Sequence, residues 1–252
     1  MLTTRQSQIL EKLESQGTYS VSRLASDFNV SLETVRRDLK LLTDNGSVVR
    51  VHGAVGLAGQ MGEAPFQRRM RENSAAKQLI ANHVAASIRD GDSIMLDTGT
   101  TTSFIARELI NHRRLSVITN SSDIARTLAT VNGNKVYIAG GQLRADSAAA
   151  FGKTALEFIR QFTVQHAIIS AGAVNEQGIM DFDLEEAEFA RTVLSMGNRR
   201  IVVTDHTKFG RRGLVQVTGF EAVTDFITDK MPPPEIARAM ASGETRLVIA
   251  GQ

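Results

Sequence analysis

The sequence predicts an α/β domain with a mainly parallel sheet, preceded by an N-terminal winged helix-turn-helix domain. Three amphipathic helical patterns followed by a short β-rich stretch predict the N-terminal domain. From residue 74 onward, short apolar runs rich in β-branched residues alternate with helical patterns, as in βαβ units. We therefore expect a winged helix-turn-helix domain at 1–56, a linker at 57–73 and an α/β domain at 74–252.

The length allows two domains or one large one, and the composition supports a hydrophobic core. The chain has 252 residues, of which 42% are hydrophobic, and no cysteine, which excludes disulfides and thiolate metal sites. No apolar run reaches the roughly 20 residues of a membrane span or forms a signal sequence, so a cytoplasmic protein without a membrane partner is expected. The net charge of +2 is small, so a DNA-binding face must come from local placement of charges. Nothing in the sequence indicates a cofactor.

The first two helical patterns predict the supporting helices of the N-terminal domain. The segment 4–16 forms the first, with Ile9 and Leu13 facing inward. The segment 21–28 forms the second, because its apolar residues recur at helical spacing, and Asn29-Val30 makes a short turn.

The third pattern, Ser31 to Leu39, predicts a recognition helix that enters the major groove of DNA. Ser31 can accept a backbone N–H at the helix start, and Val35 and Leu39 share the inward face. A charged and hydroxyl-bearing face is left for bases and phosphates. The alternative is an ordinary helical hairpin with a solvated charged face.

Two short strands around a turn are expected within 47–53, as a wing beside the helices. For Arg23, a solvated position is as well supported as a phosphate contact. The expected DNA-binding residues are Arg23, Ser31, Glu33, Thr34, Arg36, Arg37, Arg50 and His52.

Five strands are expected in the second domain, with helices between them. A helix capped by Ser74 is expected to run to residue 88, and further helices should begin near residues 101 and 122. The predicted strands are 93–97, 115–119, 135–139, 166–171 and 200–204.

Ligands of such sheets bind beyond the carboxyl ends of the strands, where this sequence places small and polar residues. After the first strand, Asp97 and Gly99 precede Thr100, Thr101 and Thr102, whose N–H groups and hydroxyls suit an anion at a helix start. The alternative is a capped helix start without a ligand. The other candidate effector residues are Asn120, Gly140, Gly141, Asp183, Glu186 and Lys208.

Two of these candidates also have simpler interpretations. Lys208 could supply a charge for a phosphate, or it could be an ordinary surface lysine. The carboxylates between Asp181 and Glu186 could hold a cation, but solvated carboxylates at a helix start are favoured, and no metal site is expected.

Several of these motifs resemble the DeoR family of bacterial repressors. In the N-terminal domain, the resemblance lies in Val35-Arg36-Arg37-Asp38-Leu39 and in Arg50-x-His52-Gly53, although Ala54 follows where the family usually has glycine. In the second domain it lies in Asp97-x-Gly99-Thr100-Thr101, Thr119-Asn120, Gly140-Gly141-x-Leu143 and Asp205-His206-x-Lys208-Phe209-Gly210.

The resemblance implies a sensor domain similar to ribose-5-phosphate isomerases and a phosphorylated sugar or polyol as inducer. The segment Phe182-Asp183-x-x-Glu186 and the tail Thr228 to Pro234 look most like the glycerol-3-phosphate-responsive branch of the family.

The expected function is repression of a carbohydrate or polyol catabolic operon, by a homodimer or homotetramer bound to double-stranded operator DNA. One alternative is an isomerase-like enzyme carrying a DNA-binding arm, with a general base among Asp97, Asp183, Glu186 and His206. Assaying ribose 5-phosphate isomerisation would separate these two. Another alternative is a metabolite-dependent activator, since the sign of regulation depends on operator position.

Overall fold

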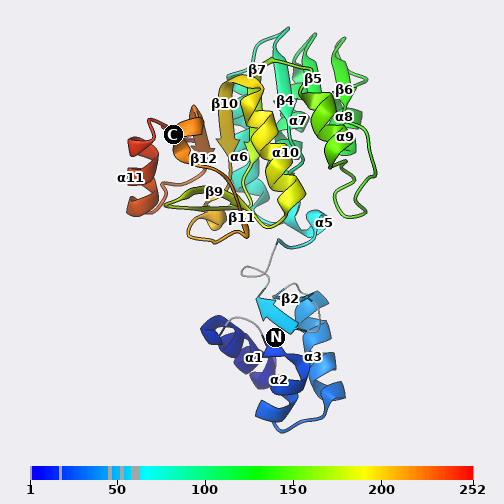
Figure 1. Ribbon diagram of the computed structural model, residues 1–252, viewed down its shortest axis with the longest axis vertical. Helices are drawn as coiled ribbons and strands as arrows, with labels where there is room; N and C mark the ends of the chain where they lie inside the picture. The colour runs from blue at the N-terminus through cyan, green and yellow to red at the C-terminus, as the bar shows by residue number, and fades with distance from the viewer. Residues whose placement is uncertain (1, 17–18, 45–46, 52–53, 58–62, 252) are drawn as a thin grey trace. The chain divides into compact units, whose positions relative to one another are not determined.

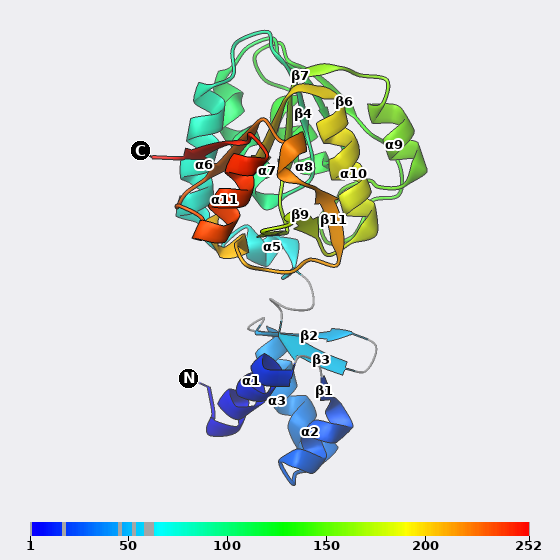
Figure 2. The same ribbon diagram turned by 60° about the vertical axis from the view of Figure 1, so that its left-hand side comes forward.

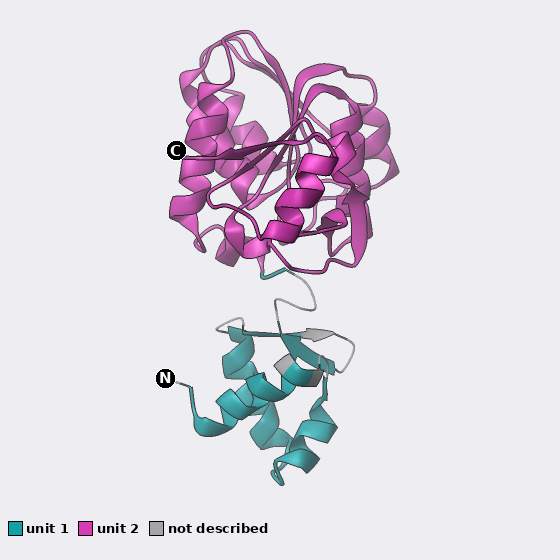
Figure 3. Ribbon diagram, turned by 90° about the vertical axis from the view of Figure 1, so that its left-hand side faces the viewer, with its two compact units in different colours: residues 1–64 teal, residues 65–252 magenta. Residues whose placement is uncertain are grey.

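The computed structural model (Figures 1 and 2) describes residues 2–16, 19–44, 47–51, 54–57 and 63–251. The chain divides into two compact units, Met1–Ala64 and Pro65–Gln252 (Figure 3). Each unit has its own hydrophobic core and is described separately.

The first unit is a winged helix-turn-helix. Its strands form a small antiparallel sheet in the order β1-β3-β2. The elements are α1 (Thr4–Gln16), β1 (Tyr19–Ser20), α2 (Val21–Asp27), α3 (Leu32–Asp44), β2 (Val48–Val51) and β3 (Ala54–Leu57). All three predicted helices are therefore confirmed.

The predicted wing was placed too early. Both strands were expected within 47–53, but the second strand begins only at Ala54. Val48 pairs with Leu57, and both Val48 and Val55 are fully buried, so the longer hairpin places apolar residues of each strand in the core. Residues 52 and 53 lie outside the described part of the chain.

The inward face predicted for the recognition helix is confirmed. Val35, Leu39 and Leu42 of α3 have no exposed surface and pack with Ile9 and Leu13 of α1. Their i, i+4, i+7 spacing places them on one side of the helix, so Arg36, Arg37 and Lys40 are left to the other side. Asp38 is the exception, since it is buried and forms an ion pair with Arg5.

The second unit is built on a parallel sheet with the strand order β13-β12-β10-β7-β4-β5-β6. Every neighbouring pair in this sheet is parallel. Its strands are β4 (Ser93–Leu96), β5 (Ser116–Thr119), β6 (Lys135–Ile138), β7 (Val164–Ser170), β10 (Gly197–Val203), β12 (Asp225–Thr228) and β13 (Arg246–Ile249). The predicted α/β class with a mainly parallel sheet is confirmed.

Helices cover both faces of this sheet (Figures 1 and 2). Successive residues of β4 show the alternation: Ile94 and Leu96 belong to one core, and Met95 belongs to the other. The first core also contains residues of α6 (Ser74–Ala86), α7 (Thr100–Glu108) and α8 (Ser122–Leu128). The second contains residues of α9 (Lys153–Ile159), α10 (Leu184–Ser195) and α11 (Pro234–Ser242).

Short elements complete the second unit. The strands β8 (Ala173–Asn175), β9 (Gly178–Asp181) and β11 (Val215–Thr218) form a separate antiparallel sheet in the order β11-β9-β8. The remaining elements are α5 (Phe66–Arg69) and three single-turn 3₁₀ helices, η1 (Leu109–Asn111), η2 (His206–Lys208) and η3 (Phe220–Ala222). None of the described helices is both long and apolar enough to cross a membrane.

Two expectations about the start of this unit need correction. The segment 57–73 was expected to be a linker, but β3 includes residue 57, and 66–69 form α5 within the second unit. Ser74 was expected to cap the next helix, whereas it is the first helical residue of α6 and Asn73 precedes it with a left-handed φ of 50°. Asparagine adopts this conformation more readily than most residues.

Candidate functional sites

The recognition helix starts with a hydroxyl cap. The Ser31 Oγ accepts a hydrogen bond from the Thr34 backbone N–H at 3.2 Å, and the two hydroxyl oxygens lie 2.9 Å apart. The preceding turn depends on Asn29, whose φ of 50° lets the chain reverse between the two helices. Asn29 and the Ser31 cap therefore set the direction in which α3 leaves the turn.

The exposed face of α3 carries most of the expected DNA-binding residues. Glu33, Arg36 and Arg37 are exposed, and they line a shallow groove of about 320 Å³ with Lys40, Thr43 and Asp44. Arg36 forms an ion pair with Glu33 at 3.8 Å, one turn earlier. Among the described carboxylates, none pairs with Arg37. This face can therefore offer a guanidinium group to a phosphate or a base edge.

The remaining expected DNA-binding residues lie on other elements. Arg23 of α2 is exposed, and its guanidinium carbon lies 5.0 Å from the centre of the Tyr19 ring. Arg50 lies in β2, but its side chain and residue His52 are outside the part of the chain that the structure describes.

The second candidate site lies at the switch point of the parallel sheet. β4 and β7 are neighbours, but the chain continues from β4 to β5 on one side and from β7 to β10 on the other. Ligands of open α/β sheets bind at such points, beyond the strand ends. Here the Asp97 carboxylate accepts hydrogen bonds from the Ser170 N–H at 3.0 and 3.2 Å, which joins the two strand ends.

A side chain at position 99 would clash with the end of β7, so glycine is required there. A Cβ atom on Gly99 would lie 1.8 Å from the Ser170 Oγ, which is less than any non-bonded contact. Glycine therefore lets the loop after β4 approach the end of β7 closely.

The Asp97 carboxyl is an unusual titrating group. It is 5% exposed, and burial raises its pKa well above the ordinary value, with the nearby Asp181 and Glu186 charges acting in the same direction. The hydrogen bond from Ser170 opposes this shift but does not cancel it. At a given pH this carboxyl is therefore protonated to a larger extent than an exposed aspartic acid, and its protonated form can donate as well as accept.

The three threonines at the start of α7 have different roles. All three are buried. Thr102 donates its hydroxyl to the carbonyl oxygens of Asp97 at 2.9 Å and Gly99 at 3.0 Å, so it fixes the loop instead of facing an anion as expected. Thr100 and Thr101 begin the helix, where backbone N–H groups are free of intrahelical partners.

The next two strand ends are tied together. The Asn120 side chain donates to the Ala150 carbonyl at 2.9 Å, and Ala150 N–H donates to the Asn120 carbonyl at 3.0 Å. A Cβ on Gly141, whose φ is +150°, would lie 3.5 Å from the Ala150 side chain. The buried Oδ1 of Asn120 has no hydrogen-bond partner among the described residues, whereas Gly140 is exposed.

Arg144 connects this loop to α10, and sequence analysis missed it. Its guanidinium donates to Asp183 at 2.8 Å, Glu185 at 2.6 Å and Glu186 at 2.9 Å. It also lies 4.3 Å from the centre of the Phe151 ring. Three of the carboxylates expected to be solvated therefore share one guanidinium.

The pKa values in this cluster follow from the ion pairs. Burial disfavours the charged form of Arg144, but the hydrogen bonds to Asp183 and Glu185 outweigh it and raise the Arg144 pKa. For Asp183, burial acts to raise the pKa, but the Arg144 hydrogen bond and the N–H groups of α10 lower it overall. Asp183 is also the N-cap of α10, accepting from the Glu185 and Glu186 N–H groups.

Lys208 belongs to an adjoining group at the end of β10. It lies in η2 near the buried Asp205 and Lys77, and its charge contributes to a lowered pKa of Lys77, for which burial is the main cause. Asp205 accepts from the Thr207 N–H at 3.1 Å and from the Asn73 amide at 3.3 Å. The structure thus brings Lys208 beside the start of α6.

Lys77 ties α5 to α6. Its ammonium group donates to the carbonyl oxygens of Arg69 and Glu72, each at 2.5 Å. A sequence signal for it existed, since Lys77 shares helical spacing with the buried Ile80 and Val84. A lysine on an apolar helix face needs acceptors, and here the end of α5 supplies them.

Comparison with known proteins identifies the two units. Residues 5–60 match the DeoR-like helix-turn-helix domain, and residues 72–230 match the DeoR C-terminal sensor domain. The chain belongs to the DeoR family. It is therefore a DNA-binding transcriptional regulator, and its second unit is the sensor domain of that family.

Full-length relatives are transcriptional repressors. The chain is 31% identical to the HTH-type transcriptional repressor CsqR of Escherichia coli K12, over 97% of this chain and 94% of that protein. It is 30% identical to the glycerol-3-phosphate regulon repressor of the same organism, over 97% and 98%. It is 34% identical to the transcriptional repressor AccR of Agrobacterium fabrum, over 89% and 88%.

Solved structures similar to part of the chain include ribose 5-phosphate isomerases. The enzyme from Neisseria gonorrhoeae matches with a TM-score of 0.39 and 15% identity, over 54% of this chain and 53% of that chain. The enzyme from Methanocaldococcus jannaschii matches with a TM-score of 0.41 and 19% identity, over 54% and 55%.

Proposed function

We propose that this DeoR-family protein represses a carbohydrate or polyol catabolic operon and is released from its operator by a phosphorylated sugar or polyol. The observation that supports the effector class most directly is the sheet switch point, where Asp97, the start of α7 and Asn120 lie at adjacent strand ends. A helix start suits a phosphate, and carboxyl and amide groups suit hydroxyls. The similarity to the glycerol-3-phosphate regulon repressor makes glycerol 3-phosphate the first compound to test.

On the DNA side, α3 enters the major groove of double-stranded operator DNA. Arg36 and Arg37 contact bases or phosphates, with Ser31, Glu33 and Thr34 at the start of the helix and Arg23, Arg50 and His52 beside it. The exposed face of α3 supports this assignment. A helix-turn-helix protein that occupies two half-sites requires a homodimer or homotetramer. Such a regulator acts in the cytoplasm.

On the effector side, the binding residues are Asp97, Gly99, Thr100, Thr101, Thr102, Asn120, Gly140, Gly141, Asp183, Glu186 and Lys208. Thr102 and Gly99 shape the loop, whereas Lys208 supplies a positive charge. The site senses its ligand without turnover, because its full-length relatives are repressors.

The first helix after the connection between the units couples effector binding to DNA binding. The Phe66 N–H at the start of α5 donates to both oxygens of Asp146, in the same loop as Arg144, at 3.1 Å. The residues after α5 are held by Lys77 and by the Asn73–Asp205 hydrogen bond. An effector that contacts these loops differently in two states would change operator affinity, by typically ~1–3 kcal/mol of coupling free energy.

The test is an operator gel shift titrated with glycerol 3-phosphate, with pentose and hexose phosphates, and with their unphosphorylated parents. Release by one phosphorylated compound but not by its parent is expected. Binding of DNA that no phosphorylated compound weakens would remove the proposed effector class while leaving the DNA-binding unit in place. Measurable isomerisation of ribose 5-phosphate, abolished by changing a single carboxylate, would contradict sensing without turnover.

A further inference from the structure

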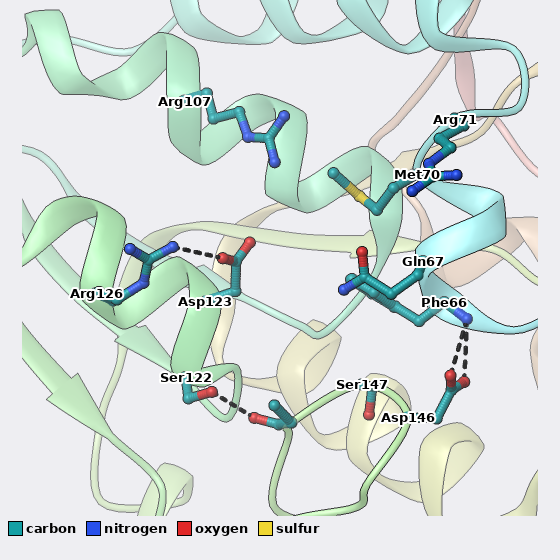
Figure 4. Close-up of a pocket in the computed structure, with 11 residues that line it drawn as sticks. Phe66, Gln67, Met70, Arg71, Arg107, Ser122, Asp123, Arg126, Asp146 and Ser147 are labelled. Atoms are coloured by element: carbon teal, nitrogen blue, oxygen red, sulfur yellow. Dashed lines mark hydrogen bonds and ion pairs between the residues drawn. The ribbon is translucent and has the colours of Figure 1, made fainter.

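A pocket of about 550 Å³ lies between α5 and the helices α7 and α8, within the second unit (Figure 4). One wall is formed by Phe66, Met70 and Arg71, and the other by Arg107 and Arg126. The loop 146–148 closes its lower side in this view. None of the effector residues proposed above lines this pocket, so it is a separate feature of the sensor domain.

The carboxylates of the pocket are already engaged. Asp123 forms an ion pair with Arg126 at 3.4 Å, and the Asp146 carboxylate accepts the Phe66 N–H. Neither Arg71 nor Arg107 pairs with a described carboxylate; Arg107 lies 5.3 Å from the centre of the Phe104 ring. Arg71 and Arg107 extend from opposite walls toward the middle of the pocket (Figure 4). Three arginines line the pocket against the two carboxylates of Asp123 and Asp146, so the pocket carries one net positive charge.

An apolar surface lies beside these arginines, since Phe66 and Met70 also line the pocket. Ser147 lines it too, but its Oγ is fully buried, so the polar contacts available to a ligand come from the guanidinium groups.

We propose that this pocket is a second ligand site of the sensor domain and binds a small phosphorylated metabolite. Guanidinium groups bind phosphate through paired N–H donors, and two of them reach this pocket from opposite sides. The volume lies within the range of small-molecule sites, and the apolar surface fits the body of an organic phosphate. A ligand here contacts both α5 and the loop that holds the Phe66 N–H, so its binding fixes the position of α5 on the sheet.

The absence of tryptophan from the chain allows a local test. Gln67 is exposed and lines the pocket, so a Gln67→Trp variant of the full-length protein carries one fluorescent reporter there. This protein is titrated with inorganic phosphate, glycerol 3-phosphate and citrate. The titrations are repeated after Arg71→Gln with Arg107→Gln, and after a matched control, Arg89→Gln with Arg113→Gln, which removes the same charge from exposed positions outside the pocket.

We expect a saturable change of emission with the two phosphates, weakened at least tenfold by the Arg71/Arg107 pair and unchanged by the control pair. No saturable change with any probe, or equal binding after loss of both pocket arginines, would overturn the proposal. A response to citrate alone would replace phosphate with a carboxylate ligand and overturn the assigned class. A response abolished by Lys208→Ala would place the binding at the switch-point site and overturn the second site. Far-UV circular dichroism confirms that each variant is folded.

Discussion

At the scale of single residues, Asp97 is buried near the carboxylates of Asp181 and Glu186 and accepts a hydrogen bond from the Ser170 N–H. Because its pKa is raised in the folded state above the ordinary value of 3.8, the folded protein binds more protons than the unfolded chain as pH rises past that value. The stability contribution of this group is therefore present at low pH and lost as pH rises through its folded pKa.

Asp97→Asn should remove this pH dependence while keeping an acceptor for the Ser170 N–H. Urea unfolding of both proteins at pH 5 and pH 8 measures it. The variant should gain free energy of unfolding relative to the wild type, and the gain should be larger at pH 8. A gain that is the same at both pH values would mean that the Asp97 pKa is not raised.

Arg37 is the residue on which the DNA-binding proposal depends most. Arg37→Ala should weaken operator binding, by about 1–3 kcal/mol at one base position if it contacts a base, or evenly across sequences if it contacts a phosphate. Arg37→Lys separates the two cases in a gel shift with single-base operator variants, since lysine keeps the charge but loses the paired donors. Unchanged affinity of Arg37→Ala would place the DNA-binding face elsewhere.

At the scale of elements, α3 carries two leucines that test its orientation. Leu39 has no exposed surface, whereas Leu41 is 54% exposed. Leu39→Ala should destabilise the first unit by about 2–5 kcal/mol because it leaves a cavity, and Leu41→Ala should change stability by less than about 0.5 kcal/mol. Chemical denaturation followed by circular dichroism measures both. Equal losses would contradict the burial pattern.

The start of α10 depends on Arg144. Arg144→Ala should reduce the free energy of unfolding by about 1–2 kcal/mol, because partly exposed charged hydrogen bonds are weakened by solvent. The Asp183 pKa is lowered in the folded state, so its contribution is present above the ordinary pKa of 3.8 and lost as pH falls. The difference between wild type and variant should therefore shrink in acid. Denaturation at pH 7 and pH 3.5 measures this difference, and Arg144→Lys should retain part of it.

The sequence predicted the elements whose patterns are long or strongly periodic. The helices of the first unit and the strands around Ile94, Val117 and Ile168 were predicted correctly, because their buried residues recur in a local apolar pattern. β12 was missed because its end residues Asp225 and Thr228, both fully buried, are polar and leave only Phe226 and Ile227 as an apolar run. β8 and β9 were missed because three or four residues carry no periodic signal.

Only those residues of the candidate site that directly follow a strand could be predicted from the sequence. Asp97 and Asn120 follow strands directly, so the parallel topology brings them to one edge. Arg144 lies in a loop between elements, and its three carboxylate partners are about forty positions later in the chain. No local sequence pattern predicts a contact between residues so far apart in the chain. The hydroxyl of Thr102 was assigned to a ligand, because sequence alone does not show that the loop carbonyls accept it.

At the scale of the whole molecule, Lys208 tests the separation of the two activities. Lys208→Ala should bind operator DNA with wild-type affinity but require at least tenfold more inducer for release, because the phosphate loses its cation. Lys153→Ala is the control, since Lys153 is exposed on α9 and, among the described residues, forms an ion pair only with Glu157 in its own helix. Gel shifts titrated with the inducer compare the three proteins. Normal release of the Lys208 variant would remove this residue from the effector site.

The two units should also fold separately. The buried residues of one core all lie at or before Val55, and those of the two sheet cores begin at Ile80. A protein comprising residues 65–252 should therefore unfold cooperatively in urea and bind the inducer but not the operator. Loss of helical circular dichroism in this fragment would show that the sensor domain needs the first unit.

The strand order of the sensor domain has a consequence for translation. The strand β4 pairs with β7, which the ribosome adds about seventy residues later, whereas the three strands of the first unit all lie between Tyr19 and Leu57. Domains fold in the order of synthesis, so the nascent chain completes its winged helix long before the sheet can close. A nonsense mutation ahead of β7 would release a polypeptide that recognises DNA and ignores the metabolite. Early stop codons in this gene should therefore differ from a deletion of it, the fragments competing with intact protein for the operator.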